Sequence, residues 1–194
     1  MILATGNRHK LREMRELLPA LELQPLPPGV EMPPEDGDSF AANALIKARA
    51  VRFATGEPVL ADDSGIAAEA LDGAPGIYSA RYAGEGSTDE INLAKLLRDV
   101  AAAAGSRRVS YVCVLALIDA DGEEHLFEGE CHGTLLEQGR GEGGFGYDPA
   151  FVPDDTGSED RRTYSELSDA EKHAISHRGR ASRLLAEHLD AARR

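Results

Sequence analysis

The stretch "PVLADDSGIA", residues 58–67, places an apolar run directly before two adjacent carboxylates, Asp62 and Asp63. Because successive side chains of a strand point to opposite faces, these carboxylates cannot share one face of a regular strand. The pattern predicts a buried strand over residues 58–61, with both carboxylates at its end. Ligands of α/β sheets bind outside the carboxyl ends of the strands. We therefore expect a binding site at this point.

The segments around this strand alternate between strand-like and helical patterns. An apolar run at residues 2–4 predicts a first strand, and a helix is expected to begin after Asn7 and to end before Pro19. Ser39 and Thr88 are expected to cap two further helices, and Gly56 to follow the end of the first of these. The apolar face of the helix after Thr88 is expected to contain Ile91, Leu97, Val100 and Ala104.

The second half of the chain predicts a hairpin, a long loop and a final helix. Strand-like runs flank "DADG", residues 119–122, which is a hairpin signal. Residues 137–162 show no period and predict an ordered, functional loop. Ser168 and Glu171 form a capping-box pattern, and the following helix is expected to run through residues 172–189. The mixture of strands and helices predicts an α/β protein, and we expect one domain over residues 1–194.

Composition and charge exclude some partners. The 194 residues contain 34 acidic and 21 basic side chains, a net charge of −13, which argues against nucleic acid because backbone binding needs a basic face. The longest apolar stretch, "YVCVLALI", is too short to span a bilayer. With no apolar signal region in "MILATGNRHK", we expect a cytoplasmic protein without a membrane partner. Cys113 and Cys131, in strand-like runs, are expected to be buried free thiols.

Two glycine-containing segments are candidate ligand loops. In "LATGNRHK", residues 3–10, a strand and a turn precede a helix start with Lys10 in its first turn, which is either an anion site or an ordinary connection. In "RGEGGFGYDP", residues 140–149, the G-x-G-x-x-G pattern follows no strand, and Pro149 excludes a clean helix, so we reject a dinucleotide fingerprint. This loop either brings Phe145 and Tyr147 to a base or anchors to the core through both rings.

Charged clusters supply further candidates. In "EKHAISHR", residues 171–178, Lys172 and Arg178 can converge on one ligand only if the helix breaks near Ser176; otherwise the run is a solvated face. His173 and His177 have the spacing of a helical metal pair, but no third zinc ligand is evident. Carboxylates able to hold Mg2+ together with phosphate oxygens are Glu35, Asp36, Asp38, Asp62 and Asp63, although the first three also fit an acidic surface loop.

Taken together, these segments resemble the inosine triphosphate pyrophosphatases, also called non-standard purine nucleoside triphosphate pyrophosphatases. Matching residues follow in order at 3–10, 40–48, 61–65, 73–82, 143–151 and 171–181. The resemblance implies an α/β fold with a long mixed central β-sheet flanked by helices and two lobes around a substrate cleft. It further implies a homodimer that hydrolyses ITP, dITP and XTP to the monophosphate and pyrophosphate with Mg2+.

The resemblance also implies roles for individual residues. Asp63 is the implied general base and a Mg2+ ligand. The usual second ligand position is occupied by Pro34, so Glu35 is the expected ligand, with Asp36 or a water as the alternatives. Asp62 is expected to point to the opposite side of the strand end, toward a basic side chain or backbone N–H groups, and either to orient Asp63 or to help hold the metal. Residues implied to bind the nucleoside triphosphate are Thr5, Gly6, Asn7, Arg8, His9, Lys10, Lys47, Ser64, Phe145, Gly146, Tyr147, Asp148, Lys172, His177 and Arg178.

Selectivity for the base is expected to come from hydrogen-bond donors. Arg178, or backbone N–H groups near residues 145–148, can donate to the 6-oxo group of hypoxanthine and xanthine but not to the 6-amino group of adenine. Two alternatives remain. A haloacid-dehalogenase-type phosphatase needs an Asp-x-Asp motif after the first strand, which here ends in Ala4 and Thr5. A nucleotide-binding sensor without turnover is left open by Pro34.

Overall fold

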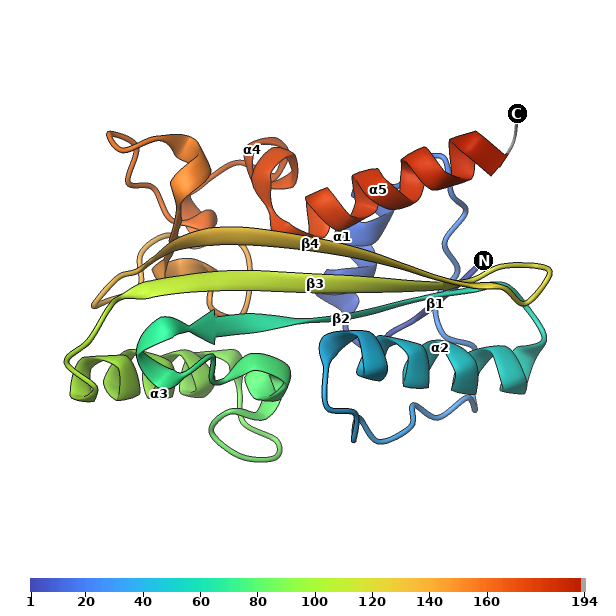
Figure 1. The fold of residues 1–194 in the computed structure, drawn as a ribbon, viewed down its shortest axis with the longest axis horizontal. Coiled ribbons are helices and arrows are strands. Elements are labelled where there is room, and N and C mark those ends of the chain that lie inside the picture. Colours follow the sequence, from blue (N-terminus) through green and yellow to red (C-terminus); the bar gives the residue numbers. More distant parts are fainter. Residues whose placement is uncertain (193–194) are drawn as a thin grey trace. The chain divides into compact units, whose positions relative to one another are not determined.

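The computed structural model describes residues 1–192 and contains a five-stranded mixed sheet with helices (Figure 1). The sheet order is β1-β2-β3-β4-β5, with β1 parallel to β2 and β4 antiparallel to β5. The strands are β1 (Ile2–Ala4), β2 (Val59–Ala68), β3 (Arg108–Ile118), β4 (Glu124–Leu135) and β5 (Phe151–Pro153). The α-helices are α1 (Arg8–Leu17), α2 (Phe40–Thr55), α3 (Asp89–Ala102), α4 (Asp169–Ile175) and α5 (His177–Ala192). The predicted α/β class is confirmed.

The chain divides into two compact units, and β2, β3 and β4 each contribute residues to both. The first unit comprises residues 1–63 and 113–129 and the chain from residue 178 onward. The second unit comprises residues 64–112 and 130–177. Among residues 1–192, no helix combines the length and hydropathy that crossing a bilayer requires.

In the first unit, alternation along the strands creates two cores. Val59 and Ala61 of β2 face α2, whereas Leu60 between them faces α1 and α5. Figure 1 shows α2 on one face of these strands and α5 on the other. The buried members of the first core are Ile2, Ala4, Ala44, Ala48, Val51, Val59, Ala61, Val114, Ala116 and Ile118. Those of the second are Leu3, Met14, Leu18, Leu23, Leu60, Cys113, Leu115, Leu117, Ala181 and Leu185.

The second unit has one core, to which α3, strand residues and the loop after β4 all contribute. Leu96 and Val100 of α3 pack with Ile66 of β2 and with an aromatic group. The rings of this group are Tyr111, Tyr147, Phe151 and Tyr164. Phe151 belongs to β5, which pairs with residues 133–135 of β4. The sequence pattern does not predict this short strand, because three residues are too few for a period to appear.

Strand β2 is longer than the sequence predicted. It runs from Val59 to Ala68 and passes through Asp62 and Asp63, so the prediction that the strand ends before them was wrong. Both carboxylates are buried, at 1% and 5% exposure. A charge in a strand interior is tolerated where it is paired and hydrogen-bonded, and each of these carboxylates has a cation beside it.

The capping predictions are confirmed, but the buried face of α3 differs from the prediction. Asn7, Ser39, Thr88 and Ser168 cap the helices that follow them, and Gly56 ends α2 in the left-handed conformation with a φ of 71°. In α3, the predicted core position Ile91 is 53% exposed. The adjacent Asn92 is buried instead, because its side chain accepts from the backbone of residue 83 and donates to the carbonyl of residue 80.

Two further predictions concern α3 and the final helix. Ala104 lies beyond the end of α3 with a φ of 49°, so it is not part of the predicted helical face. The prediction of one continuous helix over residues 172–189 was wrong, because Ser176, with a ψ of 156°, is extended and separates α4 from α5. The hairpin between β3 and β4 is confirmed, and Cys113 and Cys131 are buried free thiols as predicted.

Candidate functional site

The two adjacent carboxylates of β2 point to opposite faces of the sheet and meet different cations. Asp62 lies on the α1 and α5 face, where its Oδ2 is 3.0 Å from Lys10 Nζ and 3.1 Å from Arg178 Nη2. Asp63 lies on the α2 face, where its Oδ1 is 3.1 Å from Lys47 Nζ. The expectation that Asp62 points away from Asp63, toward a basic side chain, is confirmed. Strand alternation thus distributes two charges between two clusters.

The first of these, the Asp62 cluster, consists of Lys10, Glu13, Asp62 and Arg178. Arg178 is 2% exposed, and its Nη1 donates to Glu13 Oε2 over 2.6 Å while its Nη2 donates to Asp62. Glu13 was missed in the sequence analysis. Its position three residues after Lys10 on α1 is the available signal, because residues three apart share one helix face.

Residues 5–9 form the exposed start of α1 beside this cluster. The Asn7 side chain accepts from the backbone N–H groups of His9, over 2.9 Å, and Lys10, over 3.3 Å. The Asn7 N–H in turn donates to Thr5 Oγ1. A Cβ built on Gly6 would have no heavy atom within 4 Å, and the Arg8 side chain is exposed. The predicted phosphate-binding residues therefore form an accessible helix start with a lysine in its first turn.

The second, the Asp63 cluster, consists of Glu35, Lys47 and Asp63. Lys47 Nζ contacts Glu35 Oε1 at 2.8 Å as well as Asp63. Glu35 therefore lies at this cluster, although the usual position of the second ligand is occupied by Pro34. Asp63 Oδ2 is buried without a hydrogen-bond partner. Ser64, the next residue of β2, is partly buried and belongs to the second unit.

This donor set fits a hard divalent cation. Within the described part of the chain, no group of three or more His, Cys, Asp or Glu side chains is arranged to hold a metal ion. Mg2+ does not require such a cage, because one or two carboxylates together with substrate phosphates and waters are enough. The carboxylates of Asp63 and Glu35 are of the right chemistry to hold it. His173 and His177 have the sequence spacing of a helical metal pair but lie in two different helices, α4 and α5.

The pKa values of the two adjacent aspartates are shifted in opposite directions. Burial raises the pKa of Asp63 above its ordinary value, and although nearby lysines oppose this shift, Glu35 adds to it. Burial also acts to raise the pKa of Asp62, but Lys10 and Arg178 outweigh it and hold that pKa well below its usual range. A carboxylate with a raised pKa is the better proton acceptor. Of the two, Asp63 is therefore the candidate base.

In the second unit, the Asp148 cluster consists of Tyr111, Phe145, Asp148, Lys172 and His177. Asp148 is 3% exposed, and Lys172 Nζ donates to its Oδ2 over 2.8 Å. The backbone N–H of Phe145 donates to the same oxygen over 3.0 Å, and the Tyr111 hydroxyl donates to Oδ1 over 3.1 Å. Three donors of different kinds thus surround one buried carboxylate.

Aromatic rings complete the Asp148 cluster. The imidazole of His177 stacks on Tyr111, with ring centroids 4.5 Å apart and an interplanar angle of 5°. Lys172 Nζ lies 5.1 Å from the centroid of the Phe145 ring. The predicted site residues Phe145, Asp148, Lys172 and His177 are thus brought together, and Tyr111, which the sequence analysis did not single out, contacts two of them.

Backbone geometry fixes the loop that contains Phe145. Gly144 has a φ of 72°, and a Cβ built there would lie 2.3 Å from Asp148 Oδ2, so only glycine fits. The Gly146 N–H donates to Asp89 Oδ2 over 2.9 Å, and the Tyr147 hydroxyl donates to the Ser79 carbonyl over 2.7 Å. The N–H groups of Phe145 and Gly146, predicted as donors to a base, are therefore bound by carboxylates in this structure.

Because the helix breaks at Ser176, Lys172 and Arg178 contact two different clusters. Lys172 binds Asp148, whereas Arg178, six residues later, binds Glu13 and Asp62. The helix break at Ser176, which the expected continuous helix did not include, thus leaves each of the two cations paired to a different carboxylate.

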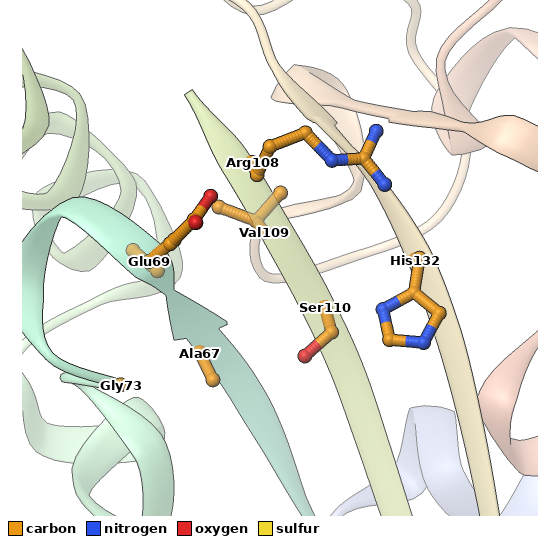
Figure 2. A pocket seen from close by; sticks show the side chains of 8 residues that line it. Ala67, Glu69, Gly73, Arg108, Val109, Ser110 and His132 are labelled. Atoms are coloured by element: carbon orange, nitrogen blue, oxygen red, sulfur yellow. The ribbon is translucent and has the colours of Figure 1, made fainter. Parts of the chain in front are cut away.

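A separate pocket lies in the second unit, with a volume of about 290 Å³. Figure 2 shows that side chains from β2, β3 and β4 surround it. Two of its charged members are already paired, because Arg108 binds Asp154 and Glu69 accepts from Ser106. The lining residues are Ala67, Ala68, Glu69, Gly73, Arg108, Val109, Ser110 and His132, so no site residue predicted from the sequence lines this pocket.

The sequence and the fold match known proteins over nearly the whole chain. A curated relative, the dITP/XTP pyrophosphatase of Geobacter sulfurreducens, is 45% identical over 197 residues, covering 97% of this chain and 96% of the relative. That of Rhodospirillum centenum is 46% identical, covering 95% and 92%. A solved structure, the HAM1 protein from Coxiella burnetii, is 41% identical with a TM-score of 0.87 and 98% coverage of both chains.

A second solved structure, the nucleoside-triphosphatase or dITP/XTP pyrophosphatase from Mycobacterium abscessus, is 42% identical with a TM-score of 0.74, covering 95% of this chain and 97% of that one. The matching family is described as the Ham1 family, and the match covers residues 1–188. These matches confirm the resemblance that the six sequence segments indicated. The chain belongs to the Ham1 family.

Proposed function

We propose that this protein hydrolyses non-standard purine nucleoside triphosphates, namely ITP, dITP and XTP, to the monophosphate and pyrophosphate. The observation that carries the proposal is the pair of aspartates in β2, one beside the lysine at an exposed helix start and one with a buried, unpartnered oxygen. Relatives 44–46% identical to this chain are dITP/XTP pyrophosphatases. The proposed setting is the cytoplasm, where the reaction removes deaminated purines from the nucleotide pool.

The Asp62 cluster and the start of α1 bind phosphate in this proposal. Lys10 and the backbone N–H groups at the helix start supply positive charge. Asp62 and Glu13 hold Arg178 through both of its terminal nitrogens, and Asp62 also holds Lys10. Lys10 stabilises the negative charge that develops on the departing pyrophosphate.

The Asp63 cluster supplies the general base, which is the group that accepts a proton from water. Asp63 Oδ2 accepts a proton from the attacking water, while Lys47 fixes Oδ1 and so orients the carboxylate. Asp63 and Glu35 would hold Mg2+, which would supply positive charge that lowers the electrostatic barrier to attack on the triphosphate. Glu35 takes the ligand role that Pro34 cannot fill.

In this proposal, the Asp148 cluster recognises the purine base of the substrate. The Phe145 ring offers a face for stacking. Lys172 is a cationic N–H donor bound to Asp148, and a donor of this kind suits the 6-oxo group of hypoxanthine and xanthine. Adenine presents a donor at that position, so we expect ATP to be a poor substrate. GTP retains the 6-oxo group, and its expected rejection depends on the 2-amino group.

A triphosphate panel tests this function directly. Purified protein with Mg2+ is given XTP, dITP, ATP and GTP, and pyrophosphate and orthophosphate are measured separately. We expect pyrophosphate from XTP and dITP, with kcat/KM for ATP lower by a factor of ~10⁴. Orthophosphate as the product would favour a phosphatase, and tight binding without turnover would favour a sensor.

A single substitution tests the assignment of Asp63 as the general base. Asp63→Asn is expected to reduce kcat by about a thousandfold, because it removes the proton acceptor and a metal charge. Asp121→Asn, which neutralises an exposed carboxylate in the turn between β3 and β4, is the matched control and should leave kcat unchanged. Equal activity of both variants would refute the role of Asp63.

We also propose a homodimer, as the resemblance to the inosine triphosphate pyrophosphatases implies. Light scattering after size-exclusion chromatography tests it. A mass twice the 20.8 kDa of one chain is expected, and a mass of one chain would contradict the proposal.

A further inference from the structure

Tyr111 of β3 contacts two residues of the candidate base site at once. Its hydroxyl donates to Asp148 Oδ1 over 3.1 Å, and its ring lies parallel to the imidazole of His177 at 4.5 Å. The same ring also packs edge-to-face on Phe151, at 4.8 Å, and is stacked on Tyr164, at 5.8 Å. Tyr111 is therefore held on several sides while it contacts two functional side chains.

The hydroxyl of Tyr111 is a fixed donor. Burial and the Asp148 carboxylate raise the pKa of Tyr111 well above its ordinary value, so the proton remains on the phenol. Asp148 Oδ2 accepts from Lys172 and from the backbone of Phe145, whereas Tyr111 is the donor to Oδ1. Without it, Oδ1 of a buried carboxylate loses this donor, and only the two hydrogen bonds to Oδ2 then restrain rotation about the Cβ–Cγ bond.

A second tyrosine in the same unit, Tyr82, also contacts an aspartate that is paired with a lysine, but this group is more exposed to solvent. Tyr82 donates to Asp99 Oδ2 over 2.7 Å, and Lys95 pairs with that carboxylate. Here the lysine and aspartate are partly exposed, and Asp99 is not a candidate site residue. The Tyr82 group therefore provides an internal control for the loss of a phenol–carboxylate hydrogen bond.

We propose that Tyr111 is a positioning residue that fixes Asp148 through its hydroxyl and His177 through its ring, and thereby sets base selectivity. The proposal rests on the proposed pyrophosphatase function. Tyr111 acts through its neighbours, so its loss should affect substrates unequally. A merely structural residue would lower activity on all triphosphates by the same factor.

The test compares Tyr111→Phe with Tyr82→Phe, since each removes one hydroxyl and keeps the ring. For Tyr111→Phe we expect KM for XTP to rise about tenfold, kcat to change less than about twofold, and the ratio of kcat/KM for XTP to that for ATP to fall about tenfold. For Tyr82→Phe we expect wild-type constants. An unchanged selectivity ratio in Tyr111→Phe would overturn the proposal.

A spectroscopic measurement separates the ring from the hydroxyl and needs no turnover. The ring protons of His177, observed by ¹H–¹⁵N NMR, should be shifted upfield by the stacked phenol. We expect Tyr111→Phe to retain this shift and Tyr111→Leu to lose it, with His125 as the internal reference. Identical His177 signals in the wild type and in Tyr111→Leu would refute the stacking role.

These outcomes distinguish the two proposals. If the wild type releases no pyrophosphate from XTP or dITP, the proposed function fails, whatever the NMR spectra show. If the wild type is active and selective but Tyr111→Phe matches it, only the positioning role fails.

Discussion

Asp62 in the first unit and Asp148 in the second are both buried carboxylates, yet different groups stabilise them. Asp62 has two cations, Lys10 and Arg178, at 3.0 and 3.1 Å. Asp148 has one, Lys172, and its other donors are a phenol and a backbone N–H. The first site therefore relies on charge balance and the second mainly on hydrogen-bond geometry. Removing a cation should be more damaging at the first site than at the second.

Replacement of Arg178 should have the largest effect on stability. Arg178→Met removes the group that joins Glu13 and Asp62, leaving two buried carboxylates with Lys10. We expect the free energy of unfolding to fall by about 3–5 kcal/mol, because breaking a buried ion pair leaves uncompensated charge. Urea denaturation measures this. A loss below that of Lys172→Met would break the comparison.

Replacement of Lys172 should have the next largest effect. Lys172→Met leaves Asp148 with the Tyr111 hydroxyl and the Phe145 N–H, so we expect a loss of about 2–3 kcal/mol in the free energy of unfolding. The double variant Lys172→Met with Asp148→Asn should recover part of it, since no buried charge then remains. Failure of the double variant to recover any stability would contradict this interpretation.

The pH dependence of stability sharpens the comparison at Asp62. Its pKa is lower in the folded state than in the unfolded state, so its contribution is present at pH values above the unfolded pKa and is lost as the pH falls. Wild type and Asp62→Asn should differ by about 2 kcal/mol at pH 6, and the difference should shrink below pH ~4. A difference that stays constant from pH 6 to pH 3 would contradict the pairing.

A surface ion pair should have the smallest effect. Arg49 and Glu124 are bidentately paired, but Arg49 is largely exposed. We expect Arg49→Met to lower the free energy of unfolding by less than about 1 kcal/mol, because solvent screens exposed pairs. This variant is also the matched control for Arg178→Met. Similar losses in the two would show that burial does not set the size of the effect.

Local rules predicted much of this arrangement from the sequence. The helix caps at Asn7, Ser39, Thr88 and Ser168 depend on residues within one turn, and all four are confirmed. Strand alternation predicted that the two aspartates of β2 diverge, and they do. The segments that carried the resemblance lie within the residues matched by the Ham1 family.

What the sequence did not reveal depends on contacts between distant residues. Glu13 meets Arg178 across 165 positions, and Tyr111 meets Asp148 across 37. The length of β2 was underestimated because the lysines and arginine that neutralise its aspartates come from three different helices. In α3, a buried asparagine displaced the expected apolar residue because its amide satisfies nearby backbone groups.

Gly144 makes the loop before Asp148 sensitive to handedness. Its φ of 72° disfavours every L-residue, and the Cβ of an L-residue would also collide with the Asp148 carboxylate. Shortening Asp148 to alanine removes the contact with its carboxylate but leaves its Cβ 2.9 Å away, and the backbone strain remains. D-alanine, introduced by chemical ligation, adopts a positive φ without strain and carries its methyl group in place of the other α-hydrogen. At this one position, a mirror-image residue should therefore be accepted where its natural counterpart is excluded.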